Sequence, residues 1–380
     1  MKGSSCRHVG GLRDSCGLRK SPIQHRSTNS TSPVVAILRT MDLALFTAPP
    51  MGSRLWNIRT AVTPRLRRSG RYLLRKVTSF GGPEQRYLGH PAVTRSLLAG
   101  LDELGVEYSY NRNAPESSRW GILSDTSTLR WAEAEIDRRF SQSRSPVIVA
   151  GPTLTDDFVS IRSELMQDHV RYLVVPCEWK ARVVGQAIPQ IAGKVRIWIA
   201  GVDQYYWIPA GPHSPRNRFL IYVKDPLRSQ SELSLVHSML KRRGLGVCVL
   251  RYGSYTREQY RTHLALSSGV IWLGGKETQC LAQFEAWSMN KPTFVRAVSE
   301  SESGSSPLSE LEGNTHMAIH SDLAYESPHL SEMTGARWES LEELSDLIAD
   351  FRDTRFAPRD WILANATDEI AARAYLDLHE

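Results

Sequence analysis

The sequence lacks long apolar runs and has few cysteines, and each absence argues against a class of protein. No stretch approaches the roughly 20 apolar residues that a membrane-spanning helix needs, and the mean hydropathy is −0.33. The five cysteines are odd in number and include no Cys-x-x-Cys pair. This argues against a disulfide-stabilised secreted scaffold and a cysteine-based zinc site. We therefore expect a cytoplasmic chain without a transmembrane segment.

Several catalytic motifs are missing as well. No Asp-x-Asp pair occurs, which disfavours a transferase that binds its donor through a metal ion. HExxH, GxSxG and GxGxxG are absent. The run GGKET has Val270 and Glu277 where a P-loop needs a glycine and a hydroxyl. We expect neither a metal ion nor a bound cofactor.

Acidic residues are scarce in the first quarter of the chain. The net charge is +7, yet residues 1–90 hold 16 Lys and Arg against 3 acids, so the rest of the chain carries about −6. The basic excess lies in one segment that lacks interleaved aromatic residues. We therefore expect no nucleic-acid partner.

Residues 1–69 are rich in Ser, Arg and Gly and show no sustained periodicity, so we predict a disordered basic extension. Its apolar patch is broken by Arg39 and Asp42, which argues against a secretory signal. Three interpretations stay open: an extension without function, an organelle-targeting leader, and a segment that attaches weakly to an anionic membrane or polyanion.

From residue 70 onward, short apolar segments alternate with segments of helical spacing. RYLLRKV at 71–77 predicts a first strand, and the spacing between Pro91 and Gly105 predicts a helix. Strands that alternate with helices form parallel sheets, and continuous apolar strands are buried on both faces. Further strands of this kind are predicted at 147–150, 172–175, 195–199, 219–223, 247–250, 270–273 and 293–295.

This pattern predicts an α/β fold of two Rossmann-like domains that face each other across a cleft. The Pro-rich stretch near residue 212 divides them into an N-terminal domain over 70–212 and a C-terminal domain over 213–355, with a final helix over 356–380. Open parallel sheets bind ligands beyond the carboxyl ends of their strands. We therefore expect the functional site between the two domains.

The most informative stretch is GGKETQCLAQFEAWSMNKPT, which follows the strand at 270–273. Glu277 stands at the strand end or helix entrance, and Glu285 lies about two turns inside the helix. A carboxylate accepts hydrogen bonds from vicinal hydroxyls, and free backbone N–H groups at a helix start bind phosphate. A nucleotide diphosphate sugar presents both chemistries.

The spacing Glu277-x7-Glu285, with a strand before it and Asn-Lys-Pro-Thr and a strand after it, resembles the E-x7-E region of retaining GT-B glycosyltransferases of the family 4 kind (glycosyl transferases group 1). Four other segments are similar to the family at matching intervals: SFGGP, VVPCEWKARVV, IAGVDQYYWIP and FLIYVKD. Together the similar segments cover about residues 70–380.

The resemblance implies a GT-B fold, a nucleotide sugar donor and specific roles. Glu277 would bind the transferred sugar, Glu285 the ribose hydroxyls, and Lys224 would neutralise the leaving diphosphate. The other implied donor-binding positions are Arg228 as the second basic residue, the backbone of Thr278, Gln279, Cys280 and Leu281 at the helix start, Tyr255 at the nucleobase site, and Gly81 and Gly82 in the N-terminal glycine loop.

The chain departs from the family pattern in places. Cys280 stands where the family commonly has glycine, the basic pair is spaced as KDPLR, and an acceptor-side histidine has only loose counterparts in His90 and His169. Structural roles are alternatives throughout: Glu277 can interact with a helix dipole, and Tyr255 can pack in a core.

The resulting hypothesis is a glycosyltransferase that moves a hexose from a nucleotide diphosphate sugar to an unknown acceptor, with retained configuration and without a metal ion. One alternative is a non-catalytic subunit of the same fold that binds a sugar nucleotide or serves as a scaffold. A second is a nucleotide-sugar epimerase. The expected partners are the donor and the acceptor, and peripheral contact with a membrane stays open.

Overall fold

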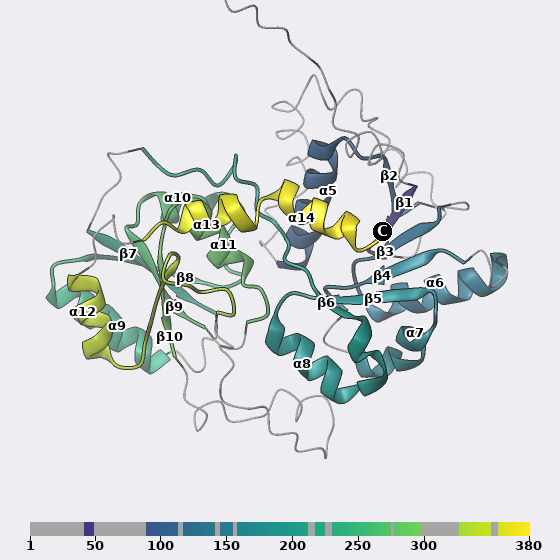
Figure 1. The fold of residues 1–380 in the computed structure, drawn as a ribbon. Coiled ribbons are helices and arrows are strands. Elements are labelled where there is room, and N and C mark those ends of the chain that lie inside the picture. Colours follow the sequence, from purple (N-terminus) through teal and green to yellow (C-terminus); the bar gives the residue numbers. More distant parts are fainter. Residues whose placement is uncertain are drawn as a thin grey trace, which may run out of the picture.

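The computed structural model describes residues 42–48, 89–112, 117–140, 145–154, 158–211, 217–224, 230–274, 277–297, 327–350 and 356–380. These residues form two parallel β-sheets, each with helices on its faces, joined by a crossover segment and by the C-terminal helices (Figure 1). The predicted class, two α/β domains with C-terminal helices, is confirmed. Within the described ranges, no helix is both long and apolar enough to cross a membrane.

The first sheet has six strands in the order β2-β1-β3-β4-β5-β6, all parallel. Their side chains alternate between two buried layers, because successive residues of a strand point to opposite faces. The strands are β1 (Leu43–Phe46), β2 (Tyr108–Tyr110), β3 (Arg119–Ile122), β4 (Val147–Ala150), β5 (Val170–Val175) and β6 (Val195–Ile197).

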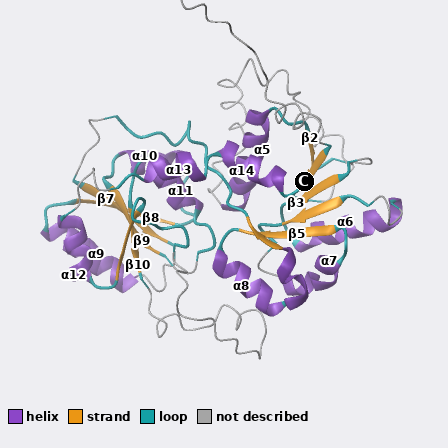
Figure 2. Ribbon diagram, in the orientation of Figure 1, coloured by secondary structure: helices purple, strands orange, loops and turns teal. Residues whose placement is uncertain are grey.

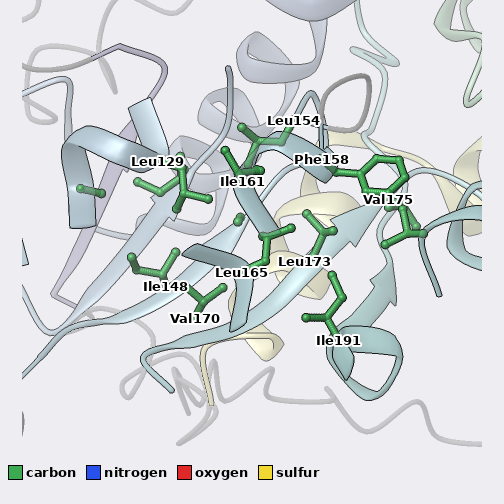
Figure 3. Packing of buried hydrophobic residues seen from close by; sticks show 14 of the residues in the cluster. Leu129, Ile148, Leu154, Phe158, Ile161, Leu165, Val170, Leu173, Val175 and Ile191 are labelled. Carbon is green, nitrogen blue, oxygen red and sulfur yellow. The ribbon is translucent and has the colours of Figure 1, made fainter. Parts of the chain in front are cut away.

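One face of this sheet packs against helices that follow its own strands. Leu129, Leu165 and Val183 of these helices contact sheet residues such as Ile148 and Leu173 in one continuous core (Figure 3). The helices are α6 (Thr126–Arg139), α7 (Arg162–Met166) and α8 (Glu178–Ala187), with 3₁₀ turns at Phe158–Ile161 and Pro189–Lys194.

The opposite face is covered by two helices from distant parts of the chain. These are α5 (Gly89–Leu104) and α14 (Asp368–Asp377), which pack against each other and against the sheet through Leu97, Leu101 and Tyr375. The last helix of the chain therefore completes the core of the first domain.

Strand β1 corrects the expectation for the N-terminal segment. The prediction that residues 1–69 form no folded structure is wrong for Leu43–Phe46, because all four residues are buried and pair with both β2 and β3. LALF is a continuous apolar run like VIVA at 147–150, but it stands in a long basic segment without a neighbouring helical pattern, so the sequence did not identify it as a strand. The strand predicted at 71–77 lies outside the described residues.

The second sheet has five parallel strands in the order β11-β10-β9-β7-β8. Strands 219–223, 247–250, 270–273 and 293–295 were expected, and β11 was not. The strands are β7 (Arg218–Val223), β8 (Gly246–Arg251), β9 (Gly269–Leu273), β10 (Thr293–Arg296) and β11 (Gly335–Trp338).

Two pairs of helices cover the second sheet, one pair on each face (Figure 2). On one face lie α9 (Gln230–Arg242) and α12 (Leu341–Ala349). On the other face lie α10 (Arg257–Ala265) and α11 (Leu281–Ser288), and α13 (Pro358–Asn365) packs against α11.

The chain passes between the domains twice, and the two passages contact each other. Trp198 and Ala200 belong to the core of the first domain, whereas Val202 and Trp207 belong to that of the second. The first passage therefore begins near residue 200, and the domain boundary at 212 stays a prediction. We call residues 198–202 the crossover segment.

The second passage joins α13 on the second domain to α14 on the first. The Val202 amide donates to the Ala366 carbonyl at 3.0 Å, and the Trp198 indole donates to the Ala371 carbonyl at 2.9 Å. A Cβ at Gly201 would collide with the Thr367 carbonyl, so only glycine permits this close approach. The contact fixes the crossover segment on the C-terminal helices.

Candidate functional site

The carboxyl ends of strands from both sheets meet at one place. The residues that follow β5 and β6 in the first domain contact the turn between β9 and α11 in the second. We call residues 277–280 the acidic turn. The Trp179 indole of α8 donates to the Glu277 carbonyl at 2.9 Å, and the contact is buried. Strand ends of two parallel sheets thus converge where such folds bind ligands.

Two further hydrogen bonds join the domains here. The Gln279 side chain accepts from the Ala200 amide at 3.1 Å and donates to the Ala200 carbonyl at 2.6 Å. His329 Nε2 donates to the Pro176 carbonyl at 3.0 Å, just beyond the end of β5. The acidic turn and the segment around His329 are therefore both attached to the first domain.

At the centre of the site, Lys224 and Glu277 form an ion pair. Lys224 directly follows β7, and its amide donates to the Leu273 carbonyl at 3.0 Å, which sets it beside the end of β9. Its Nζ contacts Glu277 Oε2. The Glu277 side chain is 2% exposed and that of Lys224 is 33% exposed. Within the described part of the chain, Glu277 Oε1 is buried without a hydrogen-bond partner.

Burial and pairing shift the titration of both partners. Burial raises the pKa of the Glu277 carboxyl, against the opposing effects of Lys224 and of the Cys280 thiol. For Lys224, burial lowers the pKa, but the nearby Glu277 carboxylate outweighs it and raises the pKa above its usual range. Lys224 is therefore positively charged at neutral pH, and its ammonium group lies beside the buried carboxylate of Glu277.

The acidic turn leads into α11 through a residue in a left-handed conformation. Cys280 has φ 63° and ψ 60°, and it makes no side-chain cap on the helix. Glycine adopts this backbone region without steric cost, whereas a residue with a Cβ, such as Cys280, does not. Burial and the Glu277 carboxylate raise the pKa of the Cys280 thiol well above its usual range. The thiol is therefore neutral and unreactive.

The other predicted residues of the turn have distinct environments. Thr278 is half-buried, whereas Gln279 is buried and its side chain holds Ala200. Leu281 packs against the cores of both domains. The backbone N–H groups at the start of α11 thus lie at the domain junction, beside the Lys224–Glu277 pair.

Glu285 is buried one turn inside α11, with a 3% exposed fraction. Its carboxylate lies near the phenols of Tyr206 and Tyr255, whose pKa values are raised mainly by burial and further by this negative charge. The two carboxylates of the E-x7-E spacing are therefore both buried at α11 but face different partners.

Tyr255, for which a nucleobase contact was predicted, lies buried among other tyrosines. It is 4% exposed, its hydroxyl lies 2.5 Å from that of Tyr222, and its ring packs on Tyr260. The packing of Tyr255 is therefore observed, and its nucleobase contact stays a prediction. Tyr252 was not predicted as a site residue. It directly follows β8, is 42% exposed, and its ring centroid lies 5.3 Å from Lys224 Nζ. An aromatic residue immediately after a strand was the available signal.

Of the remaining candidates, only the two histidines lie within the described residues. Arg228, Gly81 and Gly82 fall outside the described residues. His169 precedes β5 at the amino end of the sheet and bonds Glu133 at 2.8 Å, so it is structural. His90 lies in the first turn of α5. Where the structure is described, no group of three His, Cys, Asp or Glu side chains could hold a metal ion.

Comparisons with known proteins concern the fold. No protein-family model and no curated protein matches the sequence. Similar solved structures include TarM, at 11% identity and a TM-score of 0.44, covering 76% of this chain and 58% of that chain. This chain therefore spans less than two thirds of the length of TarM.

Two other similar structures match over most of their length. Sucrose-phosphate synthase from Thermosynechococcus elongatus is 12% identical with a TM-score of 0.43, and the match covers 89% of this chain and 98% of that chain. HepE from Anabaena, solved in complex with UDP and glucose, is 13% identical with a TM-score of 0.45, with coverages of 88% and 98%.

Proposed function

We propose that this protein is a glycosyltransferase that transfers a hexose from a nucleotide diphosphate sugar to a hydroxyl of an acceptor. The observation that carries the proposal is the Lys224–Glu277 pair at the junction of the two sheets, next to a helix start that has no side-chain cap. The site combines a positive charge, backbone donors and a buried carboxylate. A diphosphate and a sugar hydroxyl need these groups together.

Lys224 can bind the diphosphate of the donor while it keeps its ion pair with Glu277. Its ammonium has three N–H donors, and one of them suffices for Glu277 Oε2. The others are available to a phosphate, together with the N–H groups that begin α11. The departing diphosphate gains negative charge as its bond to the sugar breaks, and these donors stabilise that charge.

Glu277 would orient the sugar. Its Oε1 atom lacks a hydrogen-bond partner among the described residues, so it can accept from a hydroxyl of the hexose. A buried acceptor left without a partner costs free energy, and the sugar hydroxyl would remove that cost. We assign Glu285 to binding of the ribose hydroxyls. We assign the exposed ring of Tyr252 to a contact with one side of the nucleotide.

The chemical step balances without a redox or metal partner. The bond between the anomeric carbon and the diphosphate oxygen breaks, and the oxygen keeps the electron pair. The acceptor hydroxyl oxygen forms the new bond to the anomeric carbon, and its proton passes to the departing phosphate oxygen. Attack from the face that the diphosphate leaves retains the configuration, which is the outcome implied by the E-x7-E resemblance.

A donor screen tests the proposal. UDP-, GDP-, ADP- and TDP-sugars are added to the protein, and melting temperature and release of nucleotide diphosphate are measured. We expect one nucleotide class to raise the melting temperature and to be turned over. Glu277→Gln should lower turnover by about 100-fold, whereas Glu342→Gln, which changes an exposed carboxylate of α12, should not. No stabilisation and no turnover with any donor would refute the proposal.

Cys280 supports a second candidate, a non-catalytic subunit that binds a sugar nucleotide. Its side chain occupies the left-handed position where glycine would leave the backbone bare for close approach of a phosphate. In that case a sugar nucleotide would raise the melting temperature without release of the diphosphate. Restoring the glycine in Cys280→Gly would then increase affinity without producing turnover.

A further inference from the structure

We propose that Gln279 is a positioning residue, whose side-chain amide fixes the acidic turn on the crossover segment and so holds the Glu277 carboxylate beside Lys224. The kinetic consequence of this inference rests on the proposed function. Its structural consequence does not, and the experiment below separates the two.

The contact between Gln279 and Ala200 is specific in both directions. The amide oxygen accepts from the Ala200 N–H at 3.1 Å, and the amide nitrogen donates to the Ala200 carbonyl at 2.6 Å. Gln279 is 5% exposed and Ala200 is fully buried. One side chain thus satisfies both backbone groups of one residue, as a neighbouring strand would do.

Ala200 is a rigid anchor because the crossover segment is held on either side of it. Trp198 donates its indole N–H to Ala371, and the Val202 amide donates to Ala366. Gly201, directly after Ala200, lies against the backbone of the C-terminal segment so closely that a Cβ would come within 2.7 Å of the Asp368 Cα. The position that Gln279 contacts is therefore fixed relative to both domains.

The acidic turn needs such an anchor. It carries a buried carboxylate, and Cys280 holds a backbone conformation that is unfavourable for any residue with a side chain. Helix α11 adds no side-chain cap at this end. The Trp179 indole holds the Glu277 carbonyl, and Gln279 holds the turn two residues later. These two contacts come from neighbouring strand ends of the first domain.

Losing the amide should therefore loosen the turn. Gln279→Leu keeps the bulk of the side chain but leaves the Ala200 N–H and carbonyl without these partners, and burial makes that loss costly. The turn then opens more often. The Glu277 carboxylate leaves its place beside Lys224 for a larger fraction of the time.

The test compares three variants by amide hydrogen exchange, with the full chain and no substrate. In Gln279→Leu we expect residues 278–281 and the Trp179 indole to exchange about 10- to 100-fold faster than in the wild type. The matched control is Ser288→Ala, which removes a buried hydrogen bond of 2.8 Å from Ser288 to Trp207 at the other end of α11. Exchange of the turn should change by less than about twofold in this control.

Gln279→Glu provides a second signature. Its carboxylate can accept from the Ala200 N–H, but only the protonated acid can also donate to the Ala200 carbonyl. An ordinary glutamate has a pKa of about 4.3, so turn exchange relative to the wild type should be faster at pH 8, where the carboxylate is ionised, than at pH 4. The other titratable groups of the turn, Glu277, Lys224 and Cys280, are present in both proteins, so pH effects that are common to both proteins cancel in the ratio.

Kinetics then connect the position to function. With a reactive donor, Gln279→Leu should lower kcat by about 10- to 100-fold and change the KM for the donor by less than about threefold. Wild-type exchange rates in Gln279→Leu, or a pH-independent ratio in Gln279→Glu, would overturn the positioning role. If no donor reacts with the wild type, the proposed function fails, while the exchange data still decide the role of Gln279.

Discussion

Asp368 opens α14 where the C-terminal segment passes between the domains, and we predict that Asp368→Asn stabilises the protein at neutral and alkaline pH. The side chain is 3% exposed, and burial raises its pKa from an ordinary value of 3.8 to about 8. The Ser96 hydroxyl lowers the pKa, the charges of Asp203 and Glu103 raise it, and Arg257 lowers it. The ionised form of the buried Asp368 carboxylate therefore destabilises the contact between the two domains.

The sign and the size follow from proton linkage. The folded protein binds this proton more tightly than the unfolded chain, so stability falls as pH rises from about 4 to about 8 and then stays constant. About four pH units between the two pKa values, at roughly 1.4 kcal/mol each, give an upper bound of about 6 kcal/mol. We expect Asp368→Asn to gain about 2 to 5 kcal/mol at pH 8.5 and less than about 0.5 kcal/mol at pH 4.

Urea denaturation followed by tryptophan fluorescence measures this difference at pH 4, 6 and 8.5. Asp360→Asn is the matched control, since Asp360 also lies in the first turn of a helix but is exposed. It should lose at most about 1 kcal/mol, because an exposed carboxylate near a helix N-terminus is favourable. The reasoning is refuted if Asp368→Asn has the same effect at pH 4 and pH 8.5, or if it destabilises the protein at the higher pH.

Three further predictions concern the site and the crossover. Lys224→Ala should lower donor turnover by roughly 100-fold and ground-state donor binding by less than about tenfold, measured by single-turnover kinetics and calorimetry; equal losses would contradict its role toward the leaving diphosphate. Glu285→Ala should weaken binding of the nucleotide diphosphate by about tenfold in calorimetry, and an unchanged affinity would remove Glu285 from the ribose site. Gly201→Ala should cost about 2 to 4 kcal/mol in urea denaturation, because its Cβ would meet the backbone of residues 367 and 368. Gly193→Ala, whose Cβ would meet no atom within 4 Å, should be nearly neutral, and similar costs for the two would show that the close approach does not matter.

Both the class of fold and most of the strands were predictable because their causes are local. Runs such as 219–223 and 270–273 are apolar and continuous, since a parallel strand covered by helices has no face toward water. Strand β1 was not predictable on this basis. Its four residues stand in a long basic segment, and only pairing with β2 and β3 gives them a place in a core.

The residues of the candidate site also divide into those that local sequence patterns predict and those that only the tertiary structure identifies. The order of strand, turn and helix placed Glu277 at a strand end, whereas Lys224 was assigned only through the resemblance of FLIYVKD to a known family. Their ion pair joins positions 53 residues apart and depends on β7 and β9 being neighbours in the sheet. Tyr252 and Tyr255 look alike in the sequence, and only the packing of Tyr255 on Tyr222 and Tyr260 separates the exposed ring from the buried one.

The amino-acid sequence by itself determined most of the strands and helices and which polar residues stand at their ends, because hydrophobic periodicity and turn chemistry act over a few residues. Tertiary structure alone decided that Gln279 holds Ala200 across 79 residues and that α14 returns to the first domain. Such contacts depend on how two folded surfaces meet, and that fit is a property of the assembled side chains rather than of any local pattern.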